Sequence, residues 1–235
     1  MKAVILAAGQ GARLRPLTDD RPQCMVAYQG RPLIEHIARA LRDGGVDDIV
    51  AVRGYQPEAL RCEGMRFYDN PDYRTTSMVH TLFCAERELR GDVIVSSSNV
   101  VYSASVVRRL IDSPAELAVA IARAPRWREG VDEPPEDAET LRLDARGNIV
   151  ELGRRAQCVR LMKVEAWAWP RLHAFYAALD RDADYDGKDF ANMSMQSFVQ
   201  AIIDRLMPVK AVPVEGGWLA IDVPSDLEIA VNLRA

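Results

Sequence analysis

Mostly apolar runs alternate with helix-like patterns along the first half of the chain. The apolar runs predict buried strands at 3–6, 49–52, 65–68, 93–95 and 117–121. Between them, apolar residues recur at spacings of three and four, which predicts amphipathic helices over 32–43, 77–88 and 104–111. Strands that alternate with helices indicate right-handed βαβ units and a mostly parallel sheet.

The pattern changes beyond residue 122. Residues 126–139 are polar and acidic and contain Pro134 and Pro135, so we expect a mobile loop there. The alternating stretch 141–152, with a turn between Asp144 and Asn148, predicts a hairpin. Further elements are predicted as strands at 160–169, 209–214 and 218–221, a long amphipathic helix at 190–206 and a closing helix at 224–232.

Together these elements predict an α/β fold with a Rossmann-like, mostly parallel sheet flanked by helices. We expect one domain over 1–235, with a nucleotide-binding half of about 1–123. The substrate-binding half, which includes the added hairpin, would span about 124–235. Ligands of such sheets bind beyond the carboxyl ends of the strands. The residues that follow the strands are therefore the candidates for function.

Composition narrows the class of protein. A chain of 235 residues with 49% hydrophobic and 27% charged residues is typical of a globular domain with a sizeable core. Its net charge of −4 provides no basic field for nucleic acid. No run approaches the roughly 20 apolar residues of a membrane span, and the apolar start is too short for a signal peptide. We therefore expect a cytoplasmic protein with neither a nucleic-acid nor a membrane partner.

Metal and disulfide chemistry find no support in the spacing of the cysteines and histidines. Cys24, Cys62, Cys84 and Cys158 are irregularly spaced, and the three histidines are scattered. No zinc pattern or disulfide framework follows from such spacings.

The segment after the first strand carries the clearest chemical signal. That strand runs directly into the small residues of 7–12, which let the backbone approach a ligand and direct N–H groups at phosphate oxygens. Arg13 and Arg15 follow and can neutralise a phosphate with planar donors. A tight strand–turn–helix that needs glycine only for its geometry is the alternative interpretation.

Two other phosphate cradles do not match this segment. No Gly-x-x-x-x-Gly-Lys-Ser/Thr sequence occurs anywhere, which excludes a P-loop. A dinucleotide-binding loop needs a third glycine where Leu14 stands, which argues against a nicotinamide-dependent oxidoreductase.

Residues 6–18, Leu-Ala-Ala-Gly-Gln-Gly-Ala-Arg-Leu-Arg-Pro-Leu-Thr, resemble the signature loop of the NTP-dependent nucleotidyltransferases of the sugar-phosphate and phosphocholine type. Segments 70–73, 91–95 and 218–227 are similar to the phosphocholine and phosphonate cytidylyltransferase branch of that family. The resemblance implies transfer of a nucleotidyl group, with CMP from CTP favoured, to a small phosphate monoester or phosphonate. Pyrophosphate would be released, with Mg²⁺ as the cofactor.

The same resemblance assigns roles to individual residues. The nucleotide would be bound by Leu6, Ala7, Ala8, Gly9, Gly11, Ala12, Arg13, Gly54 and Ser98. Arg13, Gln23 and Lys163 would contact phosphates during catalysis, Lys163 being one of only four lysines in the chain. Asp222 and Asn99 would hold the magnesium ion.

Two of these positions depart from the family pattern, because Gln23 replaces a lysine and Asn99 replaces an aspartate. Three explanations are open. The enzyme uses its arginines and Asp222 in an altered arrangement, or the chain carries a deliberate Asp-to-Asn change. Alternatively, the protein binds a nucleotide with little or no turnover and has a regulatory or scaffolding role. Restoring lysine and aspartate is expected to raise the rate of a merely weakened enzyme.

No single residue fixes the base or the acceptor. A choline-type acceptor would need aromatic and acidic side chains around its ammonium group. The aromatic candidates are Trp127, Trp167, Trp169, Tyr185 and Trp218, although packing is the favoured role of Trp167 and Trp169. The acidic candidates are Asp182, Asp184, Asp186 and Asp189, for which a solvated acidic loop is the favoured interpretation. Gln196 or Ser197 stands where the family has an acidic residue, which weakens the choline hypothesis. A phosphonate, a phosphorylated amino acid or amide, or a sugar 1-phosphate stays open. A homodimer through the hairpin or the acidic loop is compatible with the sequence.

Overall fold

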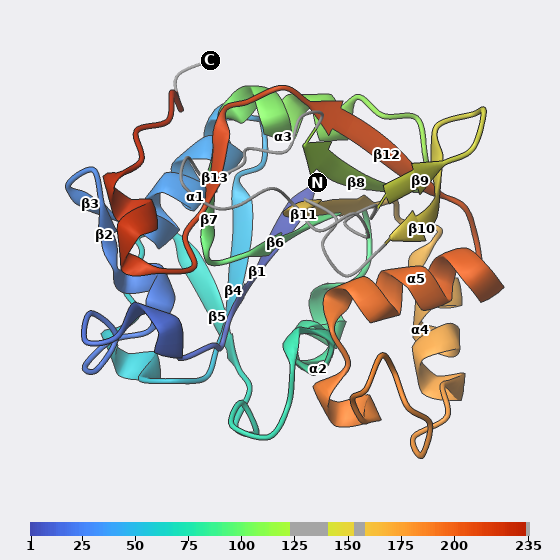
Figure 1. Ribbon diagram of the computed structural model, residues 1–235, viewed down its shortest axis with the longest axis horizontal. Helices are drawn as coiled ribbons and strands as arrows, with labels where there is room; N and C mark the ends of the chain where they lie inside the picture. Colours follow the sequence, from blue (N-terminus) through green and yellow to red (C-terminus); the bar gives the residue numbers. More distant parts are fainter. Residues whose placement is uncertain (123–140, 153–157, 234–235) are drawn as a thin grey trace, which may run out of the picture.

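A computed structural model describes residues 1–122, 141–152 and 158–233, and its centre is a nine-stranded sheet in the order β5-β4-β1-β6-β11-β8-β12-β10-β9 (Figure 1). The strands of this sheet are β1 (Lys2–Ala7), β4 (Asp48–Arg53), β5 (Met65–Asp69), β6 (Val93–Ser97), β8 (Leu117–Ala122), β9 (Leu141–Leu143), β10 (Asn148–Leu152), β11 (Cys158–Val164) and β12 (Val209–Val214). Two further strand pairs join β7 (Val100–Tyr102) to β13 (Trp218–Ala220) and β2 (Ala27–Tyr28) to β3 (Arg31–Pro32).

Most of the large sheet is parallel, as the alternation of strands and helices predicts. β5, β4, β1 and β6 pair in parallel, and so do β8 and β12. β11 lies antiparallel between β6 and β8, and β10 pairs antiparallel with both β12 and β9. The predicted α/β fold and hairpin are therefore confirmed.

Helices cover both faces of the sheet (Figure 1). Because β1 alternates sides, Ala3 and Ile5 pack on one face while Val4 and Leu6 pack on the other. The first face is covered by α1 (Leu33–Asp43) and α3 (Ala104–Ile111). The second is covered by α2 (Met78–Cys84), α4 (Trp169–Ala178) and α5 (Met195–Arg205).

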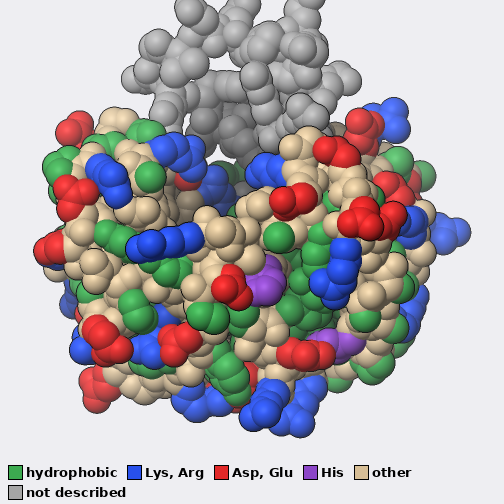
Figure 2. Space-filling view, turned by 90° about the horizontal axis from the view of Figure 1, so that it is seen from below, with side chains coloured by type: hydrophobic (Ala, Val, Ile, Leu, Met, Phe, Trp, Pro, Cys, Tyr) green, Lys and Arg blue, Asp and Glu red, His purple; other side chains and the backbone are tan. Residues whose placement is uncertain are grey.

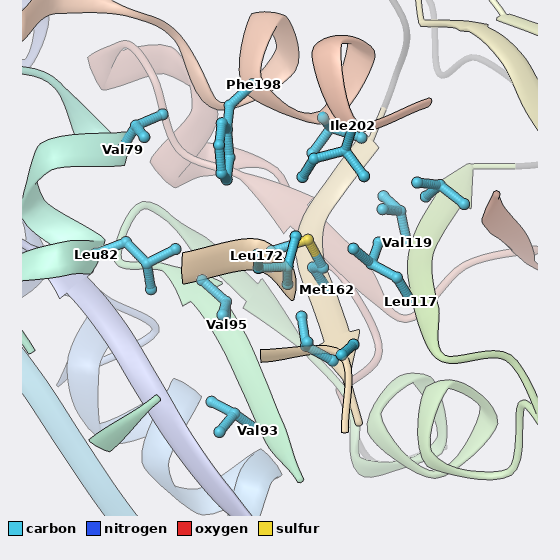
Figure 3. Close-up of a cluster of buried hydrophobic side chains, with 14 of the residues drawn as sticks. Val79, Leu82, Val93, Val95, Leu117, Val119, Met162, Leu172, Phe198 and Ile202 are labelled. Atoms are coloured by element: carbon cyan, nitrogen blue, oxygen red, sulfur yellow. The ribbon is translucent and has the colours of Figure 1, made fainter. Parts of the chain in front are cut away.

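Figure 3 shows the core on the second face, where side chains from both ends of the sequence meet. Val95 of β6 and Val119 of β8 flank Met162 of β11, and Phe198 and Ile202 of α5 close the cluster from above. All five side chains are buried. Residues from the two predicted halves of the chain therefore share one hydrophobic core.

α4 is a helix where the sequence pattern predicts only the end of a strand. β11 ends at Val164 rather than at residue 169, and α4 begins at Trp169 with Pro170 in its first turn. Proline is tolerated there because its missing N–H would have no partner within the helix. Trp169 and Leu172 are buried against the sheet, so tertiary packing decides the conformation.

The two late helices are shorter than predicted. Residues 190–192 form a separate 3₁₀ turn, and α5 begins only after Ser194, whose hydroxyl accepts a hydrogen bond from the backbone N–H of Ser197. The predicted closing helix is a 3₁₀ turn of Pro224–Glu228. The other 3₁₀ turns are Ala12–Leu14, Gln23–Met25, Pro57–Ala59 and Glu86–Glu88.

One sequence prediction concerns a segment that the structure does not describe. The acidic loop of 126–139, with Trp127, lies outside the described residues.

Among the helices that the structure describes, none is long and apolar enough to cross a membrane. On the described surface that faces the viewer in Figure 2, Lys and Arg are interspersed with Asp and Glu, without a broad patch of one sign.

An ion-pair network ties the start of β1 to β5. The buried carboxylate of Glu88 accepts hydrogen bonds from Arg66 Nη1 at 2.6 Å and Tyr68 Oη at 2.9 Å, and it also pairs with Lys2. The hydrogen bonds from Arg66 dominate, and those from Lys2 and Tyr68 add to them against the opposing effect of burial. The pKa of Glu88 consequently falls from its ordinary value of 4.5 to about 2.

Replacing this carboxylate tests the network. Glu88→Gln is expected to lower the free energy of unfolding at pH 7 by on the order of 2–3 kcal/mol, since the lowered pKa measures how strongly the folded state prefers the ionised group. The stabilisation is present above pH 4.5 and is lost as the pH falls towards about 2. Urea unfolding of both proteins between pH 7 and pH 2.5 checks this. A difference that does not shrink on acidification would contradict it.

Candidate functional site

Several strand ends meet at one edge of the sheet. β1, β4 and β6 are parallel and end there, with Ala7 opposite Arg53 and Leu6 opposite Ser97. β11 runs the other way, so its amino-terminal end reaches the same edge, where Leu161 pairs with Ser96. The predicted glycine loop, the residues after β4 and β6 and the start of β11 are therefore neighbours.

The glycine loop is shaped by Gly11. This residue has φ +69°, a left-handed conformation that favours glycine, and it precedes the turn Ala12–Leu14. A Cβ at Gly11 would lie 2.6 Å from the Cβ of Gln23. The hydroxyl of Thr18 donates to the Gly11 carbonyl oxygen at 3.0 Å and closes the loop.

Gly54 joins the loop to β4. The backbone N–H of Tyr55 donates to the Ala8 carbonyl oxygen at 3.0 Å, and a Cβ at Gly54 would lie 2.7 Å from that same oxygen. Gly9 is different, because a Cβ built there meets nothing within 4 Å and its φ is not left-handed. Packing within the protein therefore explains Gly54 but leaves Gly9 without a structural reason.

At this edge, the carboxylate of Asp222 accepts hydrogen bonds from three side chains. Its Oδ1 accepts hydrogen bonds from Arg160 Nη1 at 3.0 Å, Arg13 Nη2 at 3.0 Å and Asn99 Nδ2 at 2.9 Å. Its Oδ2 accepts from Arg160 Nη2 at 2.8 Å, which makes the Arg160 contact bidentate. Burial acts to raise the pKa of Asp222, but Arg160, followed by Arg13 and Asn99, outweighs it, so the pKa lies below its usual value.

The backbone beside Asp222 is held by both side-chain and backbone groups of the site. Gln23 Nε2 donates to the Ile221 carbonyl oxygen at 2.8 Å. The backbone N–H of Ile221 donates to the Asn99 carbonyl oxygen at 2.8 Å, and Asp226 accepts from the backbone N–H of Asp222 at the same distance. Gln23 and Asn99, the two departures from the family pattern, thus both fix the segment that carries Asp222.

The structure brings most of the predicted site residues to this edge. They are the loop residues Leu6, Ala7, Ala8, Gly9, Gly11, Ala12 and Arg13, together with Gln23, Gly54, Ser98, Asn99 and Asp222. A cavity of about 440 Å³ lies elsewhere, between α1 and the C-terminal segment, and none of these residues lines it.

Lys163 requires a correction, because it lies towards the opposite edge. In β11 it pairs with Ile94 and Ala118, near the starts of β6 and β8. Its side chain is 2% exposed, and its ammonium donates to the Ser113 carbonyl oxygen and pairs with Glu165 at 3.2 Å. The predicted phosphate contact fails because β11 is antiparallel, which a single sequence does not reveal.

Arg160 is the site residue that sequence reasoning missed. It stands in β11 with φ +59°, where the pairing with β8 shifts register between Cys158 and Met162. Such an irregularity redirects a side chain relative to a regular strand. The only signal in the sequence is an arginine near the start of a predicted strand, which becomes informative once the strand's direction is known.

In this arrangement the two predicted magnesium ligands, Asn99 and Asp222, contact each other and the two arginines. Asn99 offers its amide nitrogen to Asp222, and guanidinium groups contact both carboxylate oxygens. Within 1–122, 141–152 and 158–233, no group of three His, Cys, Asp or Glu side chains is placed to hold a metal ion. Magnesium itself stays a prediction for the reaction, since Mg²⁺ is often held mainly by substrate phosphates.

Comparison with known proteins shows close relatives along the whole chain. The chain is 39% identical over 253 aligned residues to the CTP:phosphoglutamine cytidylyltransferase of Campylobacter jejuni, an alignment that covers 99% of this chain and 100% of that protein.

Two solved structures share the fold. The CTP:phosphocholine cytidylyltransferase of Streptococcus pneumoniae has a TM-score of 0.72 at 21% identity, covering 97% of this chain and 96% of the other. The inositol-1-phosphate CTP transferase of T. maritima has a TM-score of 0.74 at 19% identity, covering 96% and 90%.

A family model described as the MobA-like NTP transferase domain matches residues 3–180, which include the glycine loop, Asn99 and Arg160. The chain belongs to this nucleotidyltransferase family.

Proposed function

We propose that the protein transfers CMP from CTP to a small phosphorylated acceptor and releases pyrophosphate. The observation that carries this proposal is the glycine loop beside the Arg13–Asp222–Arg160 cluster, in a chain 39% identical to a CTP-dependent enzyme over its full length. A nucleotide beyond the ends of β1, β4 and β6 would lie against both features.

In this reaction a phosphate oxygen of the acceptor attacks the α-phosphorus of CTP. A new phosphorus–oxygen bond forms, the bond from the α-phosphorus to the oxygen that bridges to the β-phosphate breaks, and pyrophosphate leaves with that electron pair. Backbone N–H groups of the loop and the guanidinium of Arg13 would neutralise charge on the phosphates. The protein therefore contributes mainly positioning and positive charge.

A phosphorylated amino-acid amide is the acceptor class we favour. The relative that matches the full length is a phosphoglutamine enzyme by name. An aromatic cage for choline has less support, because aromatic rings of α2 and of the substrate-binding half pack on one another. The ring centroids of Phe83 and Tyr176 are 3.6 Å apart in a stack, and those of Tyr176 and Phe190 are 5.2 Å apart.

The second candidate is a nucleotide-binding homologue with little or no turnover. It is favoured by Gln23 and Asn99, which provide neither the lysine nor the aspartate of the family pattern. Loss of one charge-stabilising group can lower a rate by about 10²–10³.

Cytoplasmic localisation and a homodimer also stay predictions.

Pyrophosphate release separates the two candidates. With Mg²⁺ present, we expect turnover with CTP and phosphoglutamine, slower turnover with phosphocholine, and little with ATP, GTP or UTP. Calorimetric titration of the four nucleotides accompanies the assay. Binding of CTP without turnover on any acceptor would support the second candidate, and absence of any nucleotide binding would refute both.

Two glycine variants test whether CTP lies in the loop. Gly9→Ala is expected to keep the wild-type Tm, because open space surrounds the position, but to lower CTP affinity about tenfold or more by intruding on the ligand. Gly54→Ala is the matched comparison and should lower the Tm, because its methyl group would meet Ala8 and Tyr73. Thermal melts and CTP titrations check both, and unchanged CTP binding by Gly9→Ala would contradict the proposed position.

A lysine variant tests the corrected role of Lys163. Lys163→Met is expected to lower the free energy of unfolding by about 1–3 kcal/mol, since Ser113 and Glu165 would lose a buried partner. The KM for CTP should stay within about twofold of wild type. A large rise in KM with an unchanged Tm would return Lys163 to the nucleotide site.

A further inference from the structure

We infer that Arg160 is a phosphate-binding residue that supplies positive charge beside Asp222, in the place where the family pattern puts a metal ion between two acidic side chains. The inference rests on the proposed function and adds to it a residue, a ligand group and a metal dependence. Three observations carry it: the charge balance of the cluster, the geometry of Arg160 and the orientation of Asn99.

The charge balance favours an anion over a further cation. Asp222 contributes one negative charge, whereas Arg13 and Arg160, both hydrogen-bonded to it, contribute two positive charges, and Asn99 is neutral. These four side chains therefore carry a net charge of +1, and the buried carboxylate of Asp226 lies next to them, where it accepts the backbone N–H of Asp222. A divalent cation at Asp222 would have to replace guanidinium donors at both oxygens and remain next to them, whereas a phosphate would bind to the guanidinium groups directly.

Arg160 has the geometry of a preformed phosphate donor. Its left-handed backbone at the irregular start of β11 directs the side chain to the edge, and its two terminal nitrogens bind Asp222 in parallel. The same planar fork matches two oxygens of a phosphate. Its side chain is 32% exposed and that of Arg13 is 71% exposed, so both can turn to a ligand that enters from solvent.

Asn99 suits the arginine-based arrangement better than an aspartate at the same position would. An aspartate at this position would put a second carboxylate about 2.9 Å from Asp222, and two such charges repel unless a proton or a cation lies between them. The amide instead donates a hydrogen bond and needs no cation. The two departures at Asn99 and Gln23 thus accompany an arginine-based site, in which Asp222 holds Arg160 ready until phosphate oxygens replace it.

Nucleotide binding without metal is the direct test. CTP is titrated in EDTA, by calorimetry, into wild type and Arg160→Gln. Wild type is expected to bind CTP in EDTA, and Arg160→Gln to bind it roughly 10- to 100-fold more weakly, as for loss of a charge-assisted hydrogen bond. Arg160→Lys should recover part of the affinity, because it restores the charge but not the fork.

Two controls accompany the titration. Arg61→Gln removes an exposed arginine that pairs with Glu58 at 4.0 Å, and it should bind CTP as wild type does. Thermal melts establish that each variant is folded.

Metal binding to the nucleotide-free protein is a second readout that does not depend on activity. Mn²⁺, followed by its electron paramagnetic resonance signal, should not bind saturably to the wild-type cluster. The double variant Asn99→Asp with Arg160→Gln replaces the guanidinium by a second carboxylate and is expected to gain such a site, which makes it the positive control.

The outcomes distinguish this inference from the proposed function. Equal CTP affinity of wild type and Arg160→Gln in EDTA would overturn the role of Arg160 and leave CMP transfer intact. Wild type that binds CTP only with Mg²⁺, or Mn²⁺ binding that Asp222→Asn abolishes, would overturn it in favour of a metal site. Wild type that binds no nucleotide under any condition would overturn the proposed function as well.

Discussion

The site depends on one constraint: a half-buried carboxylate has to be matched by cations and donors from distant parts of the chain. Asp222 is approached by Arg13 from the glycine loop, Asn99 after β6 and Arg160 from β11, and each contact is a hydrogen bond of 3.0 Å or less. Each donor also reduces the cost of burying the carboxylate. The same bonds therefore position the site and join the first part of the chain to its last segment.

Strand direction decides which residues take part. Parallel strands bring the segments after β1, β4 and β6 to one edge. The antiparallel course of β11 brings Arg160 to that edge and carries Lys163 towards the other, where its ammonium is satisfied by Ser113 and Glu165. Two cations three residues apart in one strand thus have separate roles, one at the site and one in the packing of the sheet.

The elements that a single sequence predicts well are those in which local pattern and burial agree. The buried strands and the glycine loop are predictable because a strand covered on both faces is apolar throughout and Gly11 needs a left-handed backbone. α4 was missed because packing of Trp169 and Leu172 overrides a weak local pattern. Arg160 was missed because its role depends on the direction of β11 and on an irregular register, neither of which has a local signature.

The bond from Gln23 to the Ile221 carbonyl oxygen has a consequence for how such a site can change over evolutionary time. A lysine introduced at position 23 would lose the amide that holds this carbonyl, and an aspartate introduced at position 99 would place a second carboxylate beside Asp222 where the Asn99 amide now donates a hydrogen bond. Either substitution alone removes an existing interaction, whereas both are needed to restore the lysine and the aspartate of the family pattern. We therefore expect the residues at positions 23 and 99 to change together among homologues.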